Sequence, residues 1–83
     1  MNPTEINPNT ETDFTLRGEF VALCDLLKLA GVAESGGHGK VLVESGRVRV
    51  DGLPELRKTA KIRAGQVVQY GEVRIRVLPH ILV

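Results

Sequence analysis

The chain has 83 residues, enough for a single domain with a small hydrophobic core. Its composition, with 42% hydrophobic and 25% charged residues, is typical of a soluble globular protein. The apolar runs are too short to span a bilayer, and the N-terminus lacks the basic and apolar regions of a signal peptide. A single cysteine, Cys24, excludes an internal disulfide and fits a reducing compartment. We therefore expect a cytoplasmic protein that does not contact a membrane.

Charge is distributed unevenly along the chain, although the net charge is only +1. Residues 1–16 contain three acidic residues and no Lys or Arg, whereas residues 40–76 contain nine Lys or Arg and four Asp or Glu. The second segment therefore carries a net charge of +5. Such asymmetry indicates a polyanionic partner, but solvated basic residues also keep small domains soluble. Charge alone leaves both interpretations open.

Residues 1–12 are polar and show no apolar periodicity, which predicts a disordered N-terminal arm. Residues 13–83 are then predicted to form the single domain. Within it, residues 13–17 alternate as in a short strand, and apolar residues at helical spacing predict a first helix over 19–30. Cys24 lies on the apolar face of this helix, so we expect it to fill the core rather than to react.

A second helix is predicted to begin after Ser35, a favoured N-cap residue, and to run to about Ser45. One face of this helix, at helical spacing, holds Gly39, Leu42 and Val43. Another face gathers Gly36, Gly37 and Lys40 near the helix start. A helix N-terminus presents unpaired N–H groups and a partial positive charge, which suit an anion. Glycines there allow close approach of a phosphate or close packing of the two helices, and the two explanations are compatible.

After the second helix the sequence period changes to two. Residues 47–51 alternate basic and β-branched side chains, which predicts a strand, and the pair Asp51-Gly52 predicts a tight turn. A loop over 53–60 and a hairpin over 66–78 are expected to follow. This order predicts the α+β class, with two N-terminal helices packed on a small twisted antiparallel sheet.

The sequence contains no recognisable catalytic or metal-binding constellation. The run from Gly36 to Lys40 resembles a phosphate-binding loop of nucleotide hydrolases. Such a loop requires Gly where Glu34 stands and Ser or Thr where Val41 stands. One cysteine and two histidines cannot supply the four ligands of a zinc site, and no nucleophile, base and orienting group stand out together. The sequence therefore predicts a non-enzyme that uses no metal or cofactor.

The remaining candidate chemistry is phosphate binding by the basic stretch 35–61. Arg47 and Arg49 lie on one face of their predicted strand. Three further basic residues follow: Arg57, Lys58 and Lys61. Tyr70 is the only aromatic residue expected to be even partly exposed, which argues against base stacking and for recognition of shape and backbone. The alternative is that these basic side chains form only the solvated face of a sheet.

Three segments of the chain, taken together, resemble a known family. They are LCDLLKLAG (23–31), ESGGHGKVLVESGRVRVDG (34–52) and ELRKTAKIRAGQVV (55–68). Their specific features are Ser-Gly-Gly-x-x-Lys before a helix, Gly-x-Val-x-Val-Asp-Gly after it, and a basic Arg-Lys-x-x-Lys. In this order and spacing they resemble the αL RNA-binding motif named after ribosomal small-subunit protein four, here called the S-four domain. The resemblance covers roughly residues 17–78 and points to the short stand-alone bacterial members of the YbcJ type.

The resemblance implies a non-enzymatic protein that binds structured RNA, with ribosomal RNA as one candidate. By matching position it implies nine contact residues: Ser35, Gly36, Gly37, Lys40, Arg47, Arg49, Arg57, Lys58 and Lys61. Many members carry Arg where Gly36 stands, and another common arginine is replaced near Phe20. We therefore expect contact mainly to phosphate and RNA shape. The alternative is a protein–protein adaptor on the same fold, and the lack of a long apolar patch predicts a monomer.

Overall fold

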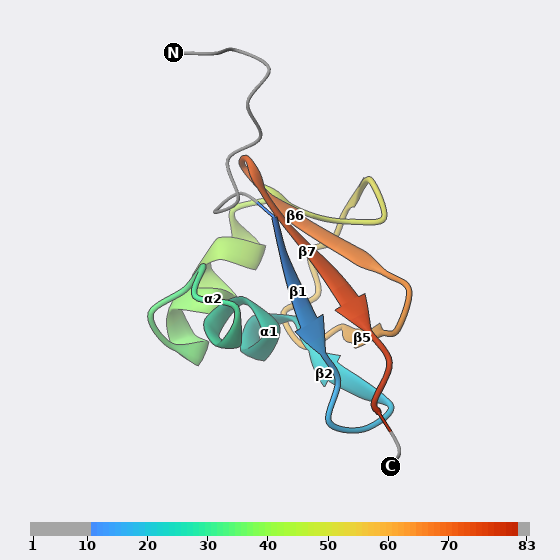
Figure 1. Ribbon diagram of the computed structural model, residues 1–83. Helices are drawn as coiled ribbons and strands as arrows, with labels where there is room; N and C mark the ends of the chain where they lie inside the picture. Colours follow the sequence, from blue (N-terminus) through green and yellow to red (C-terminus); the bar gives the residue numbers. More distant parts are fainter. Residues whose placement is uncertain (1–10, 82–83) are drawn as a thin grey trace, which may run out of the picture.

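Strands, rather than helices, come first in the described chain (Figure 1). The computed structural model describes residues 11–81, so the expected N-terminal arm lies outside the described residues except for Glu11 and Thr12, which belong to a strand. The elements in chain order are β1 (Glu11–Thr15), β2 (Phe20–Ala22), α1 (Leu23–Leu29), α2 (Gly36–Glu44), β3 (Val48–Val50), β4 (Leu53–Pro54), β5 (Lys61–Arg63), β6 (Val67–Tyr70) and β7 (Val73–Leu78). The predicted α+β class is confirmed, but the prediction that two helices come first is wrong.

The larger sheet has five strands in the order β1-β7-β6-β3-β4. Strands β6 and β7 form the predicted hairpin, and β3 pairs with β6 and β4 in antiparallel register. Strand β1, however, pairs with β7 in parallel, so the prediction of an antiparallel sheet is wrong at this edge. An ion pair between Asp13 and Arg76 (Oδ1–Nε 2.8 Å) joins the two strands. Local patterns do not reveal this pairing because it joins the two ends of the described chain.

A second sheet, of two strands, changes the start of the first helix. The sequence predicts a helix over 19–30, but residues 20–22 form β2, which pairs with β5 in antiparallel register. Helix α1 therefore begins at Leu23. Over three residues, the apolar pattern that includes Phe20 fits either a helix or a strand, and pairing with a strand distant in sequence favours the strand.

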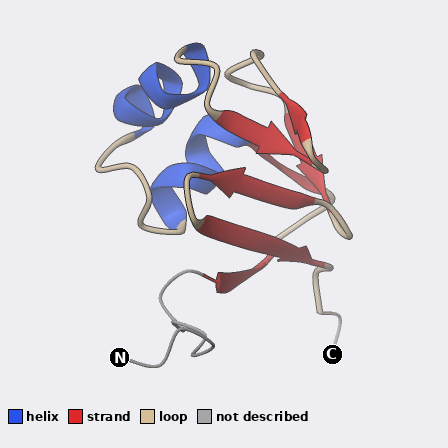
Figure 2. Ribbon diagram, turned by 90° about the horizontal axis from the view of Figure 1, so that it is seen from above, coloured by secondary structure: helices blue, strands red, loops and turns tan. Residues whose placement is uncertain are grey.

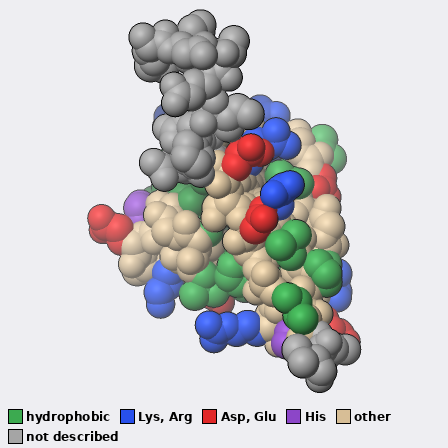
Figure 3. Space-filling view, in the orientation of Figure 1, with side chains coloured by type: hydrophobic (Ala, Val, Ile, Leu, Met, Phe, Trp, Pro, Cys, Tyr) green, Lys and Arg blue, Asp and Glu red, His purple; other side chains and the backbone are tan. Residues whose placement is uncertain are grey.

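The core lies where both helices cover one face of the larger sheet (Figure 2). Helix α2 begins after the N-cap residue Ser35 and ends at Glu44, so the prediction of this helix is confirmed. Cys24 is buried, as predicted. The side chains that are at most 1% exposed are Leu23, Leu26, Leu27, Val43, Val48, Ile62, Val68 and Ile75. Alternation along β7 places Arg74 and Arg76 on the opposite, exposed face of the sheet, and Figure 3 shows basic and acidic side chains next to each other over β1 and β7.

The predicted turn at Asp51-Gly52 joins β3 to β4. Both residues have a positive φ, 52° for Asp51 and 84° for Gly52, which fits a type I′ turn. Oδ1 of Asp51 also accepts a hydrogen bond from the backbone N–H of Val67 (2.9 Å), which ties the turn to β6. The loop predicted after this turn is partly wrong, because Leu53 and Pro54 form an edge strand, where proline is tolerated.

Gly39 brings the backbones of α1 and α2 into close contact. A Cβ atom added at Gly39 would lie 2.5 Å from the carbonyl oxygen of Cys24, well inside the van der Waals distance. Gly37, in the same helix, is not constrained in this way, because the nearest atom to its added Cβ is Oγ of Ser35 at 3.8 Å. Close packing therefore explains the glycine at position 39 but not the one at position 37.

The variant Gly39→Ala is expected to lower the free energy of unfolding by about 1–3 kcal/mol, because the two helices must shift apart. The matched variant Gly37→Ala is expected to leave this free energy unchanged or to raise it by up to about 1 kcal/mol, since alanine favours a helix. Chemical denaturation of the parent chain and both variants measures the difference. Equal stability of the two variants would contradict the packing role of Gly39.

Candidate functional site

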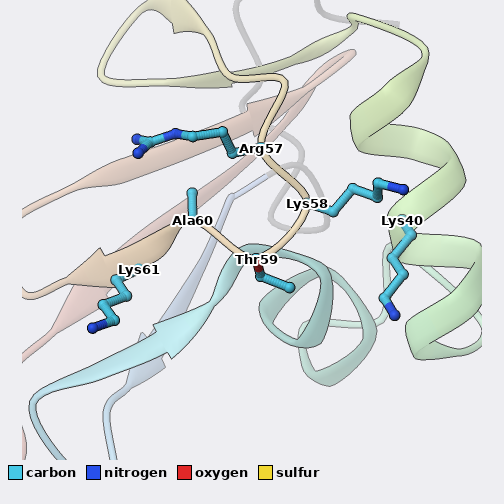
Figure 4. A pocket seen from close by; sticks show the side chains of 6 residues that line it. All are labelled: Lys40, Arg57, Lys58, Thr59, Ala60 and Lys61. Carbon is cyan, nitrogen blue, oxygen red and sulfur yellow. The ribbon is translucent and has the colours of Figure 1, made fainter.

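Four of the predicted contact residues line a single pocket between α2 and the segment 57–61, which leads into β5 (Figure 4). This pocket, called here the basic pocket, has a volume of about 620 Å³. It is lined by Lys40, Arg57, Lys58, Thr59, Ala60 and Lys61. In Figure 4, Lys58 extends toward α2, which carries Lys40, whereas Arg57 and Lys61 extend to the other side of the segment. Residues far apart in the sequence thus present cations to one hollow.

The backbone of the segment 57–61 is held by the start of α1. This helix has no side-chain cap, and its first N–H groups would otherwise lack partners. Instead, the N–H of Leu23 donates to the carbonyl of Ala60 (2.9 Å), and the N–H of Cys24 donates to the carbonyl of Lys58 (3.0 Å). The side chain of Ala60 is buried. The backbone of the segment is therefore fixed, and its charged side chains point outward.

Two of the four cations in the basic pocket are paired with carboxylates. Arg57 donates from Nε and Nη2 to the two carboxylate oxygens of Glu55, both at 3.1 Å. The pKa of Glu55 is lowered, first by this side-chain hydrogen bond and then by the backbone N–H of Arg57. Nζ of Lys58 lies 2.8 Å from Oε1 of Glu44 at the end of α2. All four side chains except that of Glu55 are well exposed, so water screens both ion pairs.

Lys40 and Lys61 differ from Arg57 and Lys58 in their pairing with carboxylates. Within residues 11–81, no Asp or Glu forms an ion pair with either lysine. Both side chains are exposed and both line the basic pocket. The charge that the pocket offers to a ligand therefore comes first from these two lysines.

The start of α2 is organised by a reciprocal pair of hydrogen bonds. Oγ of Ser35 accepts from the N–H of His38 (3.0 Å), and Nδ1 of His38 accepts from the N–H of Glu34 (3.0 Å). An added Cβ at Gly36 would meet only an ordinary contact, Oδ1 of Asp25 at 3.6 Å. Close helix packing therefore does not account for the glycines at positions 36 and 37, and approach of an anion to their backbone stays a prediction.

Arg47 and Arg49 lie apart from the basic pocket. They line a second hollow, of about 360 Å³, together with Gly46, Gln69 and Gly71. In the register of the sheet, Arg49 pairs with Gln69, which pairs in turn with Arg74. The prediction that Arg47 and Arg49 share a surface is consistent with this arrangement, but the stretch 35–61 forms two faces rather than one. Arg74, whose participation the sequence leaves open, belongs to the same sheet face as Arg49.

Sequence analysis did not identify Phe20 as an exposed aromatic residue. Phe20 lies on β2 and is 44% exposed, whereas Tyr70 packs against the core. Two cations lie near the ring: Nζ of Lys61 at 4.9 Å and Cζ of Arg63 at 5.6 Å from the centroid. No local signal distinguishes this strand position from a helical one, because its partner β5 lies far along the chain.

The described residues include no cluster that suits a metal ion. Within residues 11–81, no three His, Cys, Asp or Glu side chains gather at one place. Neither helix in the described part of the chain has the length and apolar character needed to cross a membrane.

Comparison with known proteins identifies the family. The family model described as the S4 domain, which is the S-four domain introduced above, matches residues 14–78. YbcJ of Escherichia coli (strain K12) is 48% identical over 58 residues, which is 70% of this chain and 83% of that protein. YbcJ of Shigella flexneri matches with the same identity and coverage. The chain therefore belongs to the S-four domain family.

The fold comparison agrees with this assignment. The solution structure of YbcJ from E. coli superposes with a TM-score of 0.65 and 36% identity, over 94% of this chain and 98% of that one. That structure is described as revealing an αL motif involved in RNA binding. The predicted family, and the YbcJ type within it, are confirmed.

Loss of the Ser35 cap is expected to destabilise the start of α2. The variant Ser35→Ala should lower the free energy of unfolding by about 1 kcal/mol, because the N–H of His38 loses its acceptor. The variant Ser35→Asp keeps an acceptor at the N-cap and should retain the parent stability. Thermal unfolding of the three chains checks this. A destabilisation of Ser35→Asp equal to that of Ser35→Ala would contradict the capping role.

Proposed function

We propose that this chain is a non-enzymatic protein that binds structured RNA through contacts to phosphates and to RNA shape. The observation that carries the proposal is that Lys40, Lys58 and Lys61, from two segments far apart in the sequence, line one pocket in a chain of the S-four domain family. The RNA-binding motif described for the similar YbcJ structure supports it. None of the comparisons supports the alternative, an adaptor that binds protein and not RNA.

The basic pocket suits phosphates on electrostatic grounds. Lys40 and Lys61 have no acidic partner within residues 11–81, so they bind an anion without losing an ion pair. Arg57 pairs with Glu55, which is only 19% exposed, and Lys58 pairs with the well exposed Glu44. Because both cations are open to water, these ion pairs are weak, and a phosphate replaces either carboxylate at little cost. Each phosphate that is neutralised also releases counterions, which makes binding depend on salt.

The start of α2 adds a second set of donors. Ser35 holds the first turn of the helix, and Gly36 and Gly37 leave its backbone N–H groups open to a phosphate. Arg47 follows the other end of α2, three residues after Glu44, the partner of Lys58. We infer that RNA in the basic pocket extends around this end of the helix to Arg47 and Arg49.

The positions of the cations favour one kind of RNA partner. Structured RNA fits better than an extended single strand, because the cations come from a helix, a loop and strands of both sheets rather than from one linear groove. We include ribosomal RNA among the partners, residues 13–83 as the binding domain, a monomeric state and a cytoplasmic location. We propose no metal, cofactor or membrane in this role.

Removing the two unpaired lysines is expected to weaken RNA binding and its dependence on salt. The double variant Lys40→Ala, Lys61→Ala should make the slope of log affinity against log salt less steep by about 1.8, or about 0.9 for each lost contact to a duplex. The double variant Arg74→Ala, Arg76→Ala removes the same charge from β7, whose residues line neither hollow, and should change the slope less. Titration of a structured ribosomal RNA fragment at several salt concentrations measures both. Equal effects of the two variants would show that the basic pocket is not the binding site.

Releasing Lys58 from its ion pair is expected to tighten RNA binding. The variant Glu44→Gln frees Nζ of Lys58 and removes a negative charge beside the basic pocket. The affinity should rise by up to about fivefold, because exposed ion pairs of this kind contribute up to about 1 kcal/mol. The matched variant Glu11→Gln makes the same charge change at the β1 edge and should have a smaller effect. The role of Glu44 is refuted if the two variants bind RNA equally well.

A further inference from the structure

Phe20 is the aromatic residue that the core does not use. The chain contains three aromatic residues, two Phe and one Tyr, and all three lie in the described part. Phe14 and Tyr70 pack against the core, whereas Phe20 is 44% exposed and does not. A single exposed apolar side chain is common on protein surfaces and needs no explanation by itself. The surroundings of Phe20 are what distinguish it.

The ring of Phe20 is framed by cations on the same face of the β2–β5 sheet. Phe20 pairs with Arg63, and Ala22 pairs with Lys61, so alternation along both strands places these side chains on one face. Val21 and Ile62 alternate with them, and Ile62 is fully buried. Nζ of Lys61 lies 4.9 Å and Cζ of Arg63 lies 5.6 Å from the ring centroid, both within the range of cation–π attraction. The ring is therefore held in place while part of it stays open to solvent.

Lys61 contacts both the basic pocket and the ring of Phe20. It lines the basic pocket, and its Nζ also lies over the ring of Phe20, so a stacking base would share the ring with this cation or displace it. A nucleic acid strand whose phosphate contacts Lys61 would bring the adjoining nucleotide to Phe20. Aromatic rings next to basic side chains bind unpaired bases by stacking, and they do so with little regard to sequence. The arrangement thus meets both requirements of a stacking site, an exposed ring and an anchored backbone.

We propose that Phe20, flanked by Lys61 and Arg63, forms a stacking subsite for one unpaired base of an RNA whose backbone lies in the basic pocket. This inference rests on the proposed function and adds a preference to it. The protein would favour RNA in which a duplex adjoins an unpaired nucleotide over a fully paired end. It also changes the sequence-based expectation that recognition involves no base stacking.

The test compares two RNAs that differ only in an unpaired end. One is a blunt RNA hairpin, and the other is the same hairpin with two unpaired adenosines at its 3′ end. The parent chain should bind the extended hairpin about fivefold more tightly or better, as expected for one stacked base. In Phe20→Leu this ratio should fall to about one. In Phe20→Tyr it should persist, and in the control Leu29→Ala, which trims another exposed apolar side chain, it should not change.

A fluorescence measurement gives an independent result if Phe20→Leu fails to fold. The chain contains no tryptophan, so Phe20→Trp introduces a single fluorophore at the proposed subsite. Its emission should be quenched by the extended hairpin and much less by the blunt one. Equal quenching by the two RNAs, or a parent ratio of about one while both RNAs still bind, would overturn the stacking subsite and leave the proposed function standing. Failure of the parent chain to bind either RNA would overturn both.

Discussion

The contact between Gly39 and the carbonyl of Cys24 is the constraint on which the rest of the site depends. Because the two helix backbones meet there, Lys40, the next residue of α2, lies close to the start of α1. The start of α1 in turn binds the carbonyls of Lys58 and Ala60. One close packing contact therefore sets the distance between the two walls of the basic pocket. A larger side chain at position 39 would alter the core and the site together.

The bonds that complete the fold also position the proposed RNA contacts. Helix α1 lacks a side-chain cap, and the segment 57–61 supplies acceptors for its first N–H groups. The same segment leads into β5, which pairs with β2, and this pairing places Lys61 and Phe20 on one surface. The backbone hydrogen bonds of this segment thus stabilise the fold, while its charged side chains remain exposed. The carboxylates of Glu44 and Glu55 pair with Lys58 and Arg57, and in the proposed complex phosphates take their place.

Membership of the S-four domain family agrees with this division of roles. The YbcJ proteins share nearly half of the aligned residues with this chain, and the solution structure covers almost all of the fold. The family model begins at residue 14, inside β1, whereas the strand itself begins at Glu11 and pairs along β7. The edge strand thus adds to the sheet on the side away from β3 and β4, and none of its residues lines the basic pocket.

Features that depend on near neighbours in the chain can be predicted from the sequence. Helix α2 with its Ser35 cap, the turn at Asp51-Gly52, the β6–β7 hairpin and the basic character of residues 40–61 all follow from residues within a few positions of one another. Three features appear only in the tertiary structure. They are the parallel pairing of β1, the strand at Phe20 and the division of the basic residues between two faces. Each of these depends on pairing between segments far apart in the chain, and local periodicity carries no information about such partners.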